Sequence, residues 1–494
     1  MNTSLTSAVS AWPAEWPQFD WAVIQGNVRR LQARIVKATQ AGDWRRVKAL
    51  QRFLARSFCG KALAVKRVTE NQGKRTPGVD GEIWSSDQAR RRAIDSLKRR
   101  GYQPRPLRRV YIPKAGRPDK LRPLGIPTMT DRAMQALHLL GLEPVTETLA
   151  DRNSYGFRSE RSTADAIKQC HTILSGHDRA QWVLEGDIKG CYDHIGHDWL
   201  LSHIPMDKEI LRKWLKAGFV EQGRLFPTKA GTPQGGIISP TLANRTLDGM
   251  QAALESQYGV KGNRKAGRNK VNLVRYADDF LITGSSKALL ENEVKPWVQR
   301  FLAIRGLELS DEKTRVTHVK EGFDFLGQNV RNFGGRIVIR PSKKNVQAFK
   351  AKIKAMFKEH KTVKQESLIA MLNPVIRGWA NYHRTVSAMA MFDSIDAWLW
   401  LKEWQWAKRR HPNKSARWIK AKYFVITNTS RWAFTARYKD ADGQRRQMTI
   451  VKASHTRLRR HIKVIGESNP FDPQWAPYFQ DRHDLKRFGQ RFAF

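Results

Sequence analysis

Two apolar runs separated by a short polar break stand out in residues 271–284, VNLVRYADDFLITG. This pattern predicts a β-hairpin, because each apolar run suits a half-buried strand and the polar break suits the turn. The break holds two adjacent carboxylates, Asp278 and Asp279. Successive strand residues point to opposite faces, so both carboxylates can approach one ion only if they lie at the turn. The pattern therefore predicts either a divalent-cation site or a solvated Asp-Asp turn.

Other segments carry the periodicity of helices and strands. Apolar residues fall at helical spacing from residue 24 to residue 35, and Asp43 predicts the N-cap of a second, arginine-rich helix that ends near Arg56. Residues 105–127 predict a strand, a turn and a second strand, all rich in cations. The remaining expected elements are a helix over 131–150, a helix capped by Ser162 or Thr163, a strand that ends at Asp187, a helix with Ser239 as its cap and Pro240 at its first position, a helix over 287–305, and strands over 307–316 and 323–330.

Beyond residue 335 the composition shifts towards basic and aromatic helices. Residues 343–361 predict a helix with lysines on one face and four apolar residues on the other: Phe349, Ile353, Met356 and Phe357. The aromatic segments 378–384 and 398–406 also predict helices. Residues 401–494 hold 22 Lys and Arg against 7 Asp and Glu. Such an excess of like charge is self-repelling, so an anionic partner is expected to neutralise it.

The charge of the whole chain points to nucleic acid. It has 89 Lys and Arg against 45 Asp and Glu, a net charge of +44, and these cations are interleaved with 17 Trp, 21 Phe and 10 Tyr. Cations beside planar rings suit nucleic-acid backbones and bases, although most individual rings are expected in the core. No segment approaches 18 consecutive apolar residues, so we expect no membrane partner.

The three cysteines, Cys59, Cys170 and Cys191, have neither the spacing of a metal knuckle nor that of a disulfide framework. The N-terminus has no basic segment followed by a long apolar one, so no export signal is expected. Both features favour a cytoplasmic protein, associated with the nucleoid of a bacterial cell when it acts on DNA.

A series of short blocks, taken in order, resembles one known family. The blocks are NQGKRTPGVDG, LRPLGIPT, NSYGFR, DIKGCYD, TPQGGIISP, YADD, LELSDEKT, FDFLG, GWANYH and RHPNKSARWIKAKYF. With them the chain resembles the reverse transcriptases encoded by bacterial group II introns, also called intron maturases. The resemblance implies an α+β right-hand polymerase, with fingers and a palm built on an antiparallel sheet, followed by a helical thumb or maturase domain and a small basic DNA-binding region.

The resemblance also implies roles for individual residues. Asp187, Asp278 and Asp279 would be the catalytic carboxylates that hold two Mg²⁺ ions. Lys120 and Arg122, in the finger strand, would grip the triphosphate. Gln234 would lie beside the incoming nucleotide, and Tyr192 matches the steric gate that excludes a ribose 2′-hydroxyl. Relatives often have Phe at the gate, so the hydroxyl of Tyr192 is a departure from the family pattern.

The expected domains are an N-terminal extension (1–82), fingers and palm (83–335), thumb and maturase domain (336–430) and a basic C-terminal region (431–494). The expected partners are group II intron RNA, a DNA target and primer, and deoxynucleoside triphosphates. Many relatives carry a C-terminal nuclease with paired cysteines, whereas no cysteine follows Cys191. We therefore expect an RNA-directed DNA polymerase that supports splicing and retrohoming without its own endonuclease.

Three other functions compete with this expectation. Residues 194–197, His-Ile-Gly-His, spell a signature of class I aminoacyl-tRNA synthetases, but they follow the predicted metal strand and no partner lysine loop is evident. A related reverse transcriptase recruited to another task, as in a retron, a diversity-generating element, a CRISPR-linked enzyme or phage defence, is the main alternative. A catalytically idle RNA-binding splicing factor is a third, which the three aspartates argue against.

Overall fold

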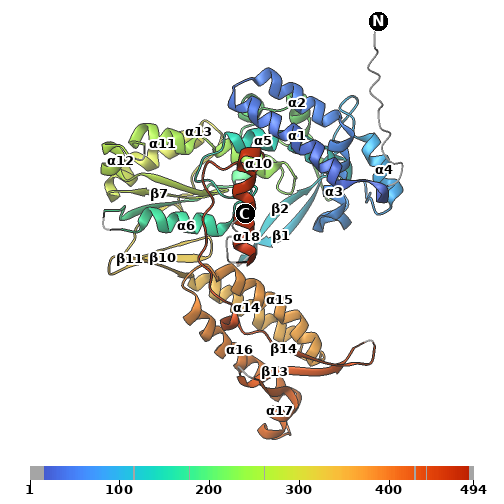
Figure 1. Ribbon diagram of the computed structural model, residues 1–494, viewed down its shortest axis with the longest axis vertical. Coiled ribbons are helices and arrows are strands. Elements are labelled where there is room, and N and C mark those ends of the chain that lie inside the picture. Colours follow the sequence, from blue (N-terminus) through green and yellow to red (C-terminus); the bar gives the residue numbers. More distant parts are fainter. Residues whose placement is uncertain are drawn as a thin grey trace. The chain divides into compact units, whose positions relative to one another are not determined.

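The computed structural model describes residues 16–114, 117–176, 178–260, 262–427, 430–440 and 442–488, with backbone alone at residues 17, 114, 117–120, 430 and 488. These residues form two compact units, whose elements are labelled in Figure 1. Unit 1 comprises residues 16–162, 183–316 and 464–488, and unit 2 comprises residues 163–182 and 317–463. Each unit buries its own set of apolar side chains.

Unit 1 begins with helices that pack on one long helix, α5. Its main helices are α1 (Trp21–Gln40), α2 (Trp44–Arg56), α3 (Phe58–Glu70), α4 (Asp87–Ser96), α5 (Met129–Thr148), α7 (Cys191–His194), α8 (His197–His203), α9 (Lys208–Leu215), α10 (Ser239–Leu247), α11 (Met250–Tyr258), α12 (Arg264–Asn269), α13 (Lys295–Ala303) and α18 (Ala476–Phe488). Helices α1, α2 and α3 contact α5. The predicted apolar face of α1 is buried, and the Asp43 carboxylate accepts a 3.0 Å hydrogen bond from the Arg46 backbone N–H at the start of α2.

Two four-stranded sheets complete unit 1, except that residue 182 of β3 and residues 317–318 of β8 are assigned to unit 2. One has the order β2-β1-β4-β5 and consists of β1 (Leu107–Lys114), β2 (Arg117–Ile126), β4 (Phe219–Glu221) and β5 (Arg224–Phe226). Strands β1 and β2 form the predicted cationic antiparallel hairpin. The other has the order β6-β7-β3-β8 and consists of β6 (Asn272–Tyr276), β7 (Asp279–Gly284), β3 (Trp182–Gly186) and β8 (Arg315–His318). This second sheet carries the candidate site.

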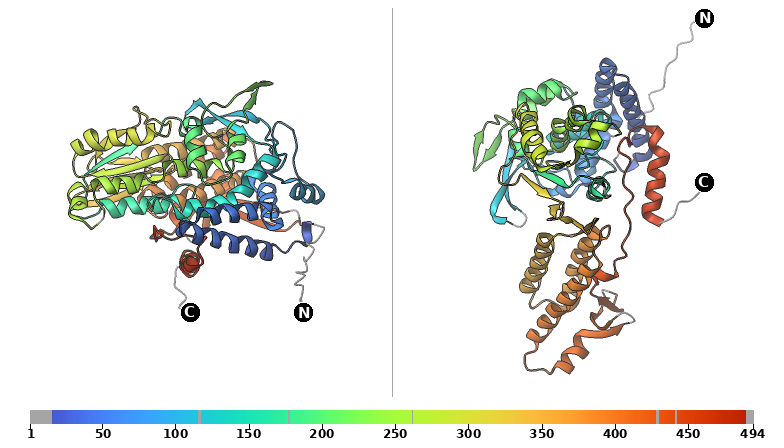
Figure 2. Two further views of the ribbon diagram at one scale, coloured as in Figure 1. Left: turned by 90° about the horizontal axis from the view of Figure 1, so that it is seen from above. Right: turned by 90° about the vertical axis from the view of Figure 1, so that its left-hand side faces the viewer.

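The C-terminal segment of the described chain returns to unit 1. The Asn469 amide donates to the Thr148 hydroxyl at 3.0 Å, and the Gln40 amide donates to the Asp472 carboxylate at 3.2 Å. Arg482, on α18, is buried and donates to the Glu160 carbonyl at 3.0 Å. Figure 2 shows α18 on the same side of unit 1 as the N-terminal helices.

Unit 2 is a helical bundle with two small sheets. Its helices are α6 (Thr163–Leu174), α14 (Lys343–Glu359), α15 (Gln365–His383), α16 (Met389–Arg410) and α17 (Ala416–Tyr423). Its sheets are β11-β10-β9, from β9 (Phe323–Phe325), β10 (Gln328–Phe333) and β11 (Arg336–Pro341), and β12-β13-β14, from β12 (Phe424–Thr427), β13 (Ser430–Lys439) and β14 (Arg445–Thr449). The predicted helical face is confirmed, since Phe349, Ile353 and Phe357 are buried while Met356 packs at the edge of the core.

Four predicted elements differ from the structure. The strand predicted over residues 323–330 is two antiparallel strands, β9 and β10, because Leu326 and Gly327 take φ values of +48° and +72° and turn the chain between them. Residues 307–314 form a single β-bridge and a turn rather than a strand, because the Lys313 and Thr314 N–H groups fold back onto the Ser310 carbonyl. Ser239 is the first residue of α10 and not its cap, since the preceding Ile238 already has helical dihedrals and the Ser239 hydroxyl accepts from Thr232. The helix predicted from residue 287 starts with a π-helical turn, η3 (Leu289–Val294), before α13.

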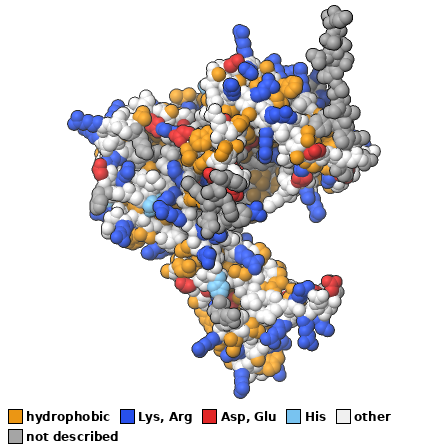
Figure 3. Space-filling model, in the orientation of Figure 1, with side chains coloured by type: hydrophobic (Ala, Val, Ile, Leu, Met, Phe, Trp, Pro, Cys, Tyr) orange, Lys and Arg blue, Asp and Glu red, His pale blue; other side chains and the backbone are white. Residues whose placement is uncertain are grey.

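Lys and Arg side chains are spread over the visible face of the molecule and outnumber the acidic ones (Figure 3). Within the described ranges, no helix combines the length and the apolar character that a membrane crossing needs.

Candidate functional site

The predicted hairpin around the two aspartates is present. Strands β6 and β7 pair antiparallel, with Tyr276 opposite Asp279, so the two residues between them form the turn. Ala277 has a φ of +56°, a left-handed conformation that is strained for a residue with a side chain. That backbone conformation breaks the alternation of strand side chains immediately before Asp278, as the sequence pattern required.

A buried arginine supports the turn from behind. Arg275, on β6, is fully buried, forms an ion pair with the buried Asp248 and donates to the Asn244 side-chain oxygen at 3.1 Å. It also donates to the Ala277 carbonyl at 3.4 Å. Since a buried guanidinium is stable only with such partners, the turn is tied to α10 and its C-terminal end.

The loop that follows residue 152 runs beside β6 and closes the back of the turn. The Tyr155 N–H donates to the Arg275 carbonyl, and the Arg275 N–H donates to the Asn153 carbonyl, each at 2.9 Å. A Cβ added at Gly156 would overlap the Ala277 backbone. The NSYGFR block thus acts as a fixed backing for the aspartate turn, and only glycine fits at its point of closest approach.

Asp187 reaches the same place from the end of β3, which neighbours β7 in the sheet. A Cβ added at Gly186 would overlap the Phe280 ring, so glycine at this position lets the two strands carry their carboxylates side by side. The Asp187 carbonyl accepts a 2.8 Å hydrogen bond from the Ser310 N–H. Its carboxylate forms an ion pair with Lys313, at 2.8 and 3.0 Å from the two oxygens.

The electrostatics show that the three carboxylates share one site. Desolvation raises the pKa of Asp278, and the negative charge of Asp187 raises it further. The Asp279 side chain is partly exposed to solvent, but many protein atoms surround it. Desolvation, followed by the negative charges of Asp278 and Asp187, raises the pKa of Asp279 to about 6. Lys313 offsets part of this repulsion at both aspartates. A raised carboxyl pKa marks negative charge that lacks a counter-charge.

Tyr192 lies against this group on α7, directly after the turn at Gly190, whose φ is +52°. It is half-buried, and desolvation together with the Asp278 charge raises the pKa of its hydroxyl, whereas Arg122 lowers it. Tyr192 is therefore placed between the aspartates and the cationic hairpin β1-β2.

The glycine-rich loop of residues 231–236 joins Tyr192 to that hairpin. At one end the Thr232 N–H donates to the Tyr192 carbonyl at 2.7 Å, and at the other the Gly125 N–H of β2 donates to the Gln234 carbonyl at 2.8 Å. A Cβ at Gly235 would crowd the Gly125 carbonyl, so the loop and β2 meet backbone to backbone. Gln234 itself is half-buried.

The sequence-predicted residues therefore occupy one region of unit 1. Asp187, Asp278, Asp279 and Tyr192 interact electrostatically, Arg122 is exposed on β2 within range of Tyr192 and Asp278, and Gln234 is linked through its loop. Lys120 lies on β2, but its side chain is outside the described residues.

Sequence reasoning missed two residues of the site. Lys313 lies in the quoted LELSDEKT block, and Arg275 is a lone cation within the apolar strand before the aspartates. The sequence does give an indication for Arg275, because a charged residue inside an apolar strand usually has a buried partner. Nothing local indicates that Lys313 pairs with a residue 126 positions away.

The carboxylate oxygens suit a hard divalent cation such as Mg²⁺. The pKa values of Asp278 and Asp279 are raised, so a nearby positive charge would stabilise both carboxylates. Within the described residues, no three His, Cys, Asp or Glu side chains are grouped so as to hold a metal ion, and Asp187 instead holds the Lys313 ammonium. The donor type therefore suits Mg²⁺, whereas the spacing of the described side chains does not form a closed metal site.

Most of the chain matches models of known protein families. Family models match for the N-terminal domain of reverse transcriptase at residues 16–97, reverse transcriptase (RNA-dependent DNA polymerase) at residues 112–330, and the group II intron maturase-specific domain at residues 346–424.

Two curated relatives and one solved structure illustrate the similarity. The protein YkfC of Escherichia coli K12 is 36% identical over 307 residues, which cover 54% of this chain and 79% of YkfC. The group II intron-encoded protein LtrA of Lactococcus lactis is 33% identical over 332 residues, 54% of each chain, so the match spans about half of LtrA. The telomerase of Candida albicans, solved with a fragment of telomeric RNA, matches with a TM-score of 0.38 and 15% identity over 57% of this chain and 54% of that chain.

Proposed function

Because the chain belongs to the family of group II intron reverse transcriptases and maturases, we propose that it is an active RNA-directed DNA polymerase that also binds its intron RNA to support splicing. The observation that carries the catalytic part is the convergence of Asp187, Asp278 and Asp279. Desolvation, followed by the charges of the neighbouring carboxylates, raises the pKa of Asp278 and Asp279, so a bound cation would stabilise their ionised forms.

The chemistry follows from the positions of the side chains. Asp187, Asp278 and Asp279 would hold two Mg²⁺ ions. Reverse transcriptases normally use divalent metal ions. When bound, such ions promote ionisation of a primer 3′-hydroxyl and stabilise the leaving pyrophosphate. Lys313 must move from Asp187 before that carboxylate is free.

The residues around the carboxylates would select and orient the nucleotide. Tyr192 interacts electrostatically with Asp278, which supports a role for its ring in excluding a ribose 2′-hydroxyl. Arg122 and Lys120 belong to strand β2 of the cationic hairpin, and their side chains would bind the triphosphate oxygens. Gln234 is held by the backbone bond between its carbonyl and Gly125, which would keep its side chain beside the base or sugar.

The test of polymerase activity is Mg²⁺-dependent extension of a DNA primer on an RNA template. Replacing Asp278 by Asn keeps the shape of the side chain and removes its charge, so extension should fall by about a thousandfold or more, while RNA binding should persist. The matched control is Asp311→Asn, an exposed carboxylate in the same unit, 4.0 Å from Lys295. Near wild-type extension by the Asp278 variant would refute the assignment and favour a splicing factor without catalysis.

The maturase part rests on the match over residues 346–424 and on the excess of basic residues. Binding to structured intron RNA should weaken steeply as salt rises, because Lys and Arg contacts with phosphates release counterions. A binding isotherm that does not respond to salt would contradict it. Splicing of the cognate intron, measured with and without the protein, separates a maturase from a reverse transcriptase recruited to another task.

Three further expectations stay predictions. They are the use of a DNA primer at the target site, retrohoming without an endonuclease of the chain's own, and the domain limits at residues 82, 335 and 430. Incubation of the purified ribonucleoprotein with target DNA tests the second, since the strand opposite the inserted intron should remain uncut.

A further inference from the structure

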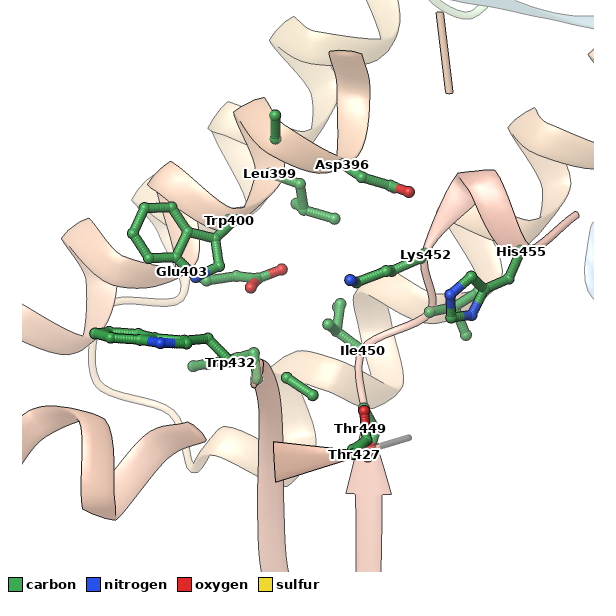
Figure 4. Close-up of a pocket in the computed structure, with 14 residues that line it drawn as sticks. Asp396, Leu399, Trp400, Glu403, Thr427, Trp432, Thr449, Ile450, Lys452 and His455 are labelled. Atoms are coloured by element: carbon green, nitrogen blue, oxygen red, sulfur yellow. The ribbon is translucent and has the colours of Figure 1, made fainter. Parts of the chain in front are cut away.

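Unit 2 contains a cavity far in sequence from the carboxylate site. It has a volume of about 470 Å³ and lies between α16 and the sheet β12-β13-β14 together with the segment after β14. That volume is within the range of about 300–1,000 Å³ that is usual for small-ligand sites. Figure 4 shows its lining, in which aromatic and aliphatic side chains surround a few polar ones.

The polar group that needs an explanation is Glu403. Its side chain lies on α16, is 3% exposed and points into the cavity (Figure 4). Among the described residues, none forms an ion pair with its carboxylate or donates a hydrogen bond to it. Burial raises the pKa of Glu403 to about 8, and the Asp396 charge contributes. A buried carboxylate without protein partners costs free energy, so a polar partner from outside the protein, such as water, an ion or a ligand, would stabilise it.

Asp396, on the same helix, shows what a structural carboxylate looks like here. One of its oxygens accepts from the Ala453 N–H at 2.7 Å, and the other accepts from the N–H and hydroxyl of Ser454 at 2.9 and 2.6 Å. Asp396 is therefore fully used in holding the segment after β14. Glu403 has no such task.

The remaining walls provide a cation and two indole rings. Lys452 points across the cavity towards Glu403, and its charge lowers the Glu403 pKa without an ion pair forming (Figure 4). The rings of Trp400 and Trp432 lie beside Glu403, with centroids 5.8 Å apart and planes at 72°. Lys420 lies 4.4 Å from the centre of the Trp432 ring. The cavity thus combines flat apolar surface with an acceptor and a donor that face each other.

We propose that this cavity binds an unpaired guanine base of the intron RNA. Guanine presents two adjacent donors, N1–H and N2–H₂, which match a carboxylate, and beside them the acceptor O6, which matches an ammonium. Glu403 would accept from the two donors while Lys452 donates to O6, and an indole face would stack on the base. The inference rests on the proposed RNA-binding function and specifies one base contact within it.

The same pattern disfavours other occupants. Adenine would place its amino group against Lys452 and offer an acceptor, N1, to the Glu403 carboxylate. A cationic peptide side chain could enter an aromatic cavity with a carboxylate, but Lys420 and Lys452 beside it would repel that charge. An RNA loop brings its own negative phosphates to these lysines, so RNA is the partner that the charges favour.

The test uses the full-length protein and fluorescent oligoadenosines with one central guanosine, inosine or adenosine, without Mg²⁺ or nucleotides. The guanosine strand should bind about ten- to a hundredfold more tightly than the adenosine strand. Inosine, which lacks the N2 amine, should be intermediate. Glu403→Gln should remove the preference, as should Lys452→Met in large part. The matched control is Asp393→Asn. Asp393 is an exposed residue on the same helix, α16, and its substitution also replaces a carboxyl group by an amide.

The proton on Glu403 gives an independent measurement. The free carboxyl holds its proton below about pH 8, whereas guanine needs the carboxylate, so affinity for the guanosine strand should rise as pH rises from 6 and level off above about 8. Asp396, Lys452 and His455 also line the cavity and could titrate. The Glu403→Gln variant keeps all three, so only a slope that disappears in this variant belongs to Glu403.

The outcomes are distinct. Equal binding of guanosine and adenosine strands, or a guanosine preference that survives in a folded Glu403→Gln variant, overturns the proposal. Tighter binding of the corresponding DNA strands would also overturn the assignment to intron RNA. An inactive polymerase would leave the guanosine preference intact, so failure of the polymerase assignment is separable. Equal unfolding temperatures of Glu403→Gln and Asp393→Asn would show that loss of preference is not loss of fold.

Discussion

The ammonium of Lys313 lies 2.8 Å from one carboxylate oxygen of Asp187 and 3.0 Å from the other. A divalent cation bound by Asp187 would need the same oxygens. Lys313→Met should therefore lower the Mg²⁺ concentration for half-maximal primer extension about fivefold, because a partly exposed ion pair contributes about 1 kcal/mol. Lys287→Met, which removes a surface pair with Glu291, is the control. An unchanged or higher Mg²⁺ requirement would show that Lys313 does not compete with the ion.

The raised pKa of Asp279 predicts that the stability of the folded protein depends on pH. Its folded-state pKa of about 6 exceeds the ordinary value of 3.8, so the folded state binds the proton more tightly. Without metal, stability should then fall as pH rises from about 4 to 6, and Asp279→Asn should unfold about 2 °C higher than the parent at pH 7 but not at pH 3.5. Thermal unfolding with and without Mg²⁺ tests this. Equal shifts at both pH values would contradict it.

Tyr192 predicts the choice of sugar. Tyr192→Val removes the ring that lies beside Asp278, so ribonucleotide incorporation should rise about tenfold or more relative to deoxynucleotide incorporation. Tyr192→Phe keeps the ring and should keep the selectivity, which separates the steric effect from any role of the hydroxyl. Single-nucleotide kinetics on one template provide the ratio. If the valine variant has the parental ratio, Tyr192 is not the gate.

What could be predicted from the sequence is what local patterns encode. The hairpin around Asp278 and Asp279, the cap at Asp43 and the buried face of α14 each depend on neighbours within a few residues, and all three are confirmed, although Asp279 begins strand β7 and only Asp278 lies in the turn. The α+β polymerase fold is confirmed as well, through the reverse transcriptase match and the mixture of helices with antiparallel sheets.

What could not be predicted depends on contacts between distant segments. Residues 307–314 have the composition of a strand, but the chain turns at Ser310 to pair with Asp187. Ser239 has the residue type of a cap, but its hydroxyl is already bonded to Thr232. Similarly, the partner of Arg275 is Asp248, from the end of α10, and the role of Gly156 follows from its closeness to Ala277. Periodicity and turn preferences contain none of this information.

The buried ion pair of Arg275 and Asp248 predicts the largest effect on stability. Both side chains are at most 2% exposed, so removal of one charge leaves the other buried without its partner. Arg275→Met should lower the free energy of unfolding by about 3–5 kcal/mol. Arg91→Met breaks an exposed pair with Asp95 and should cost less than about 1 kcal/mol. Chemical denaturation followed by tryptophan fluorescence supplies both values.

The pH dependence of the stability lost in Arg275→Met tests whether the unpaired charge of Asp248 causes that loss. Burial raises the pKa of Asp248 despite the opposing charge of Arg275, so without Arg275 the pKa should rise further. The protonated carboxyl is uncharged, hence the deficit of Arg275→Met should be smaller at pH 5 than at pH 8. Asp248→Asn added to Arg275→Met should recover stability at pH 8, because no charge remains buried. Primer extension should stay low even then, since Ala277 and Asn244 still lack the guanidinium that ties the aspartate turn to α10. Full recovery of extension in the double variant would show that Arg275 supports folding alone and does not position Asp278.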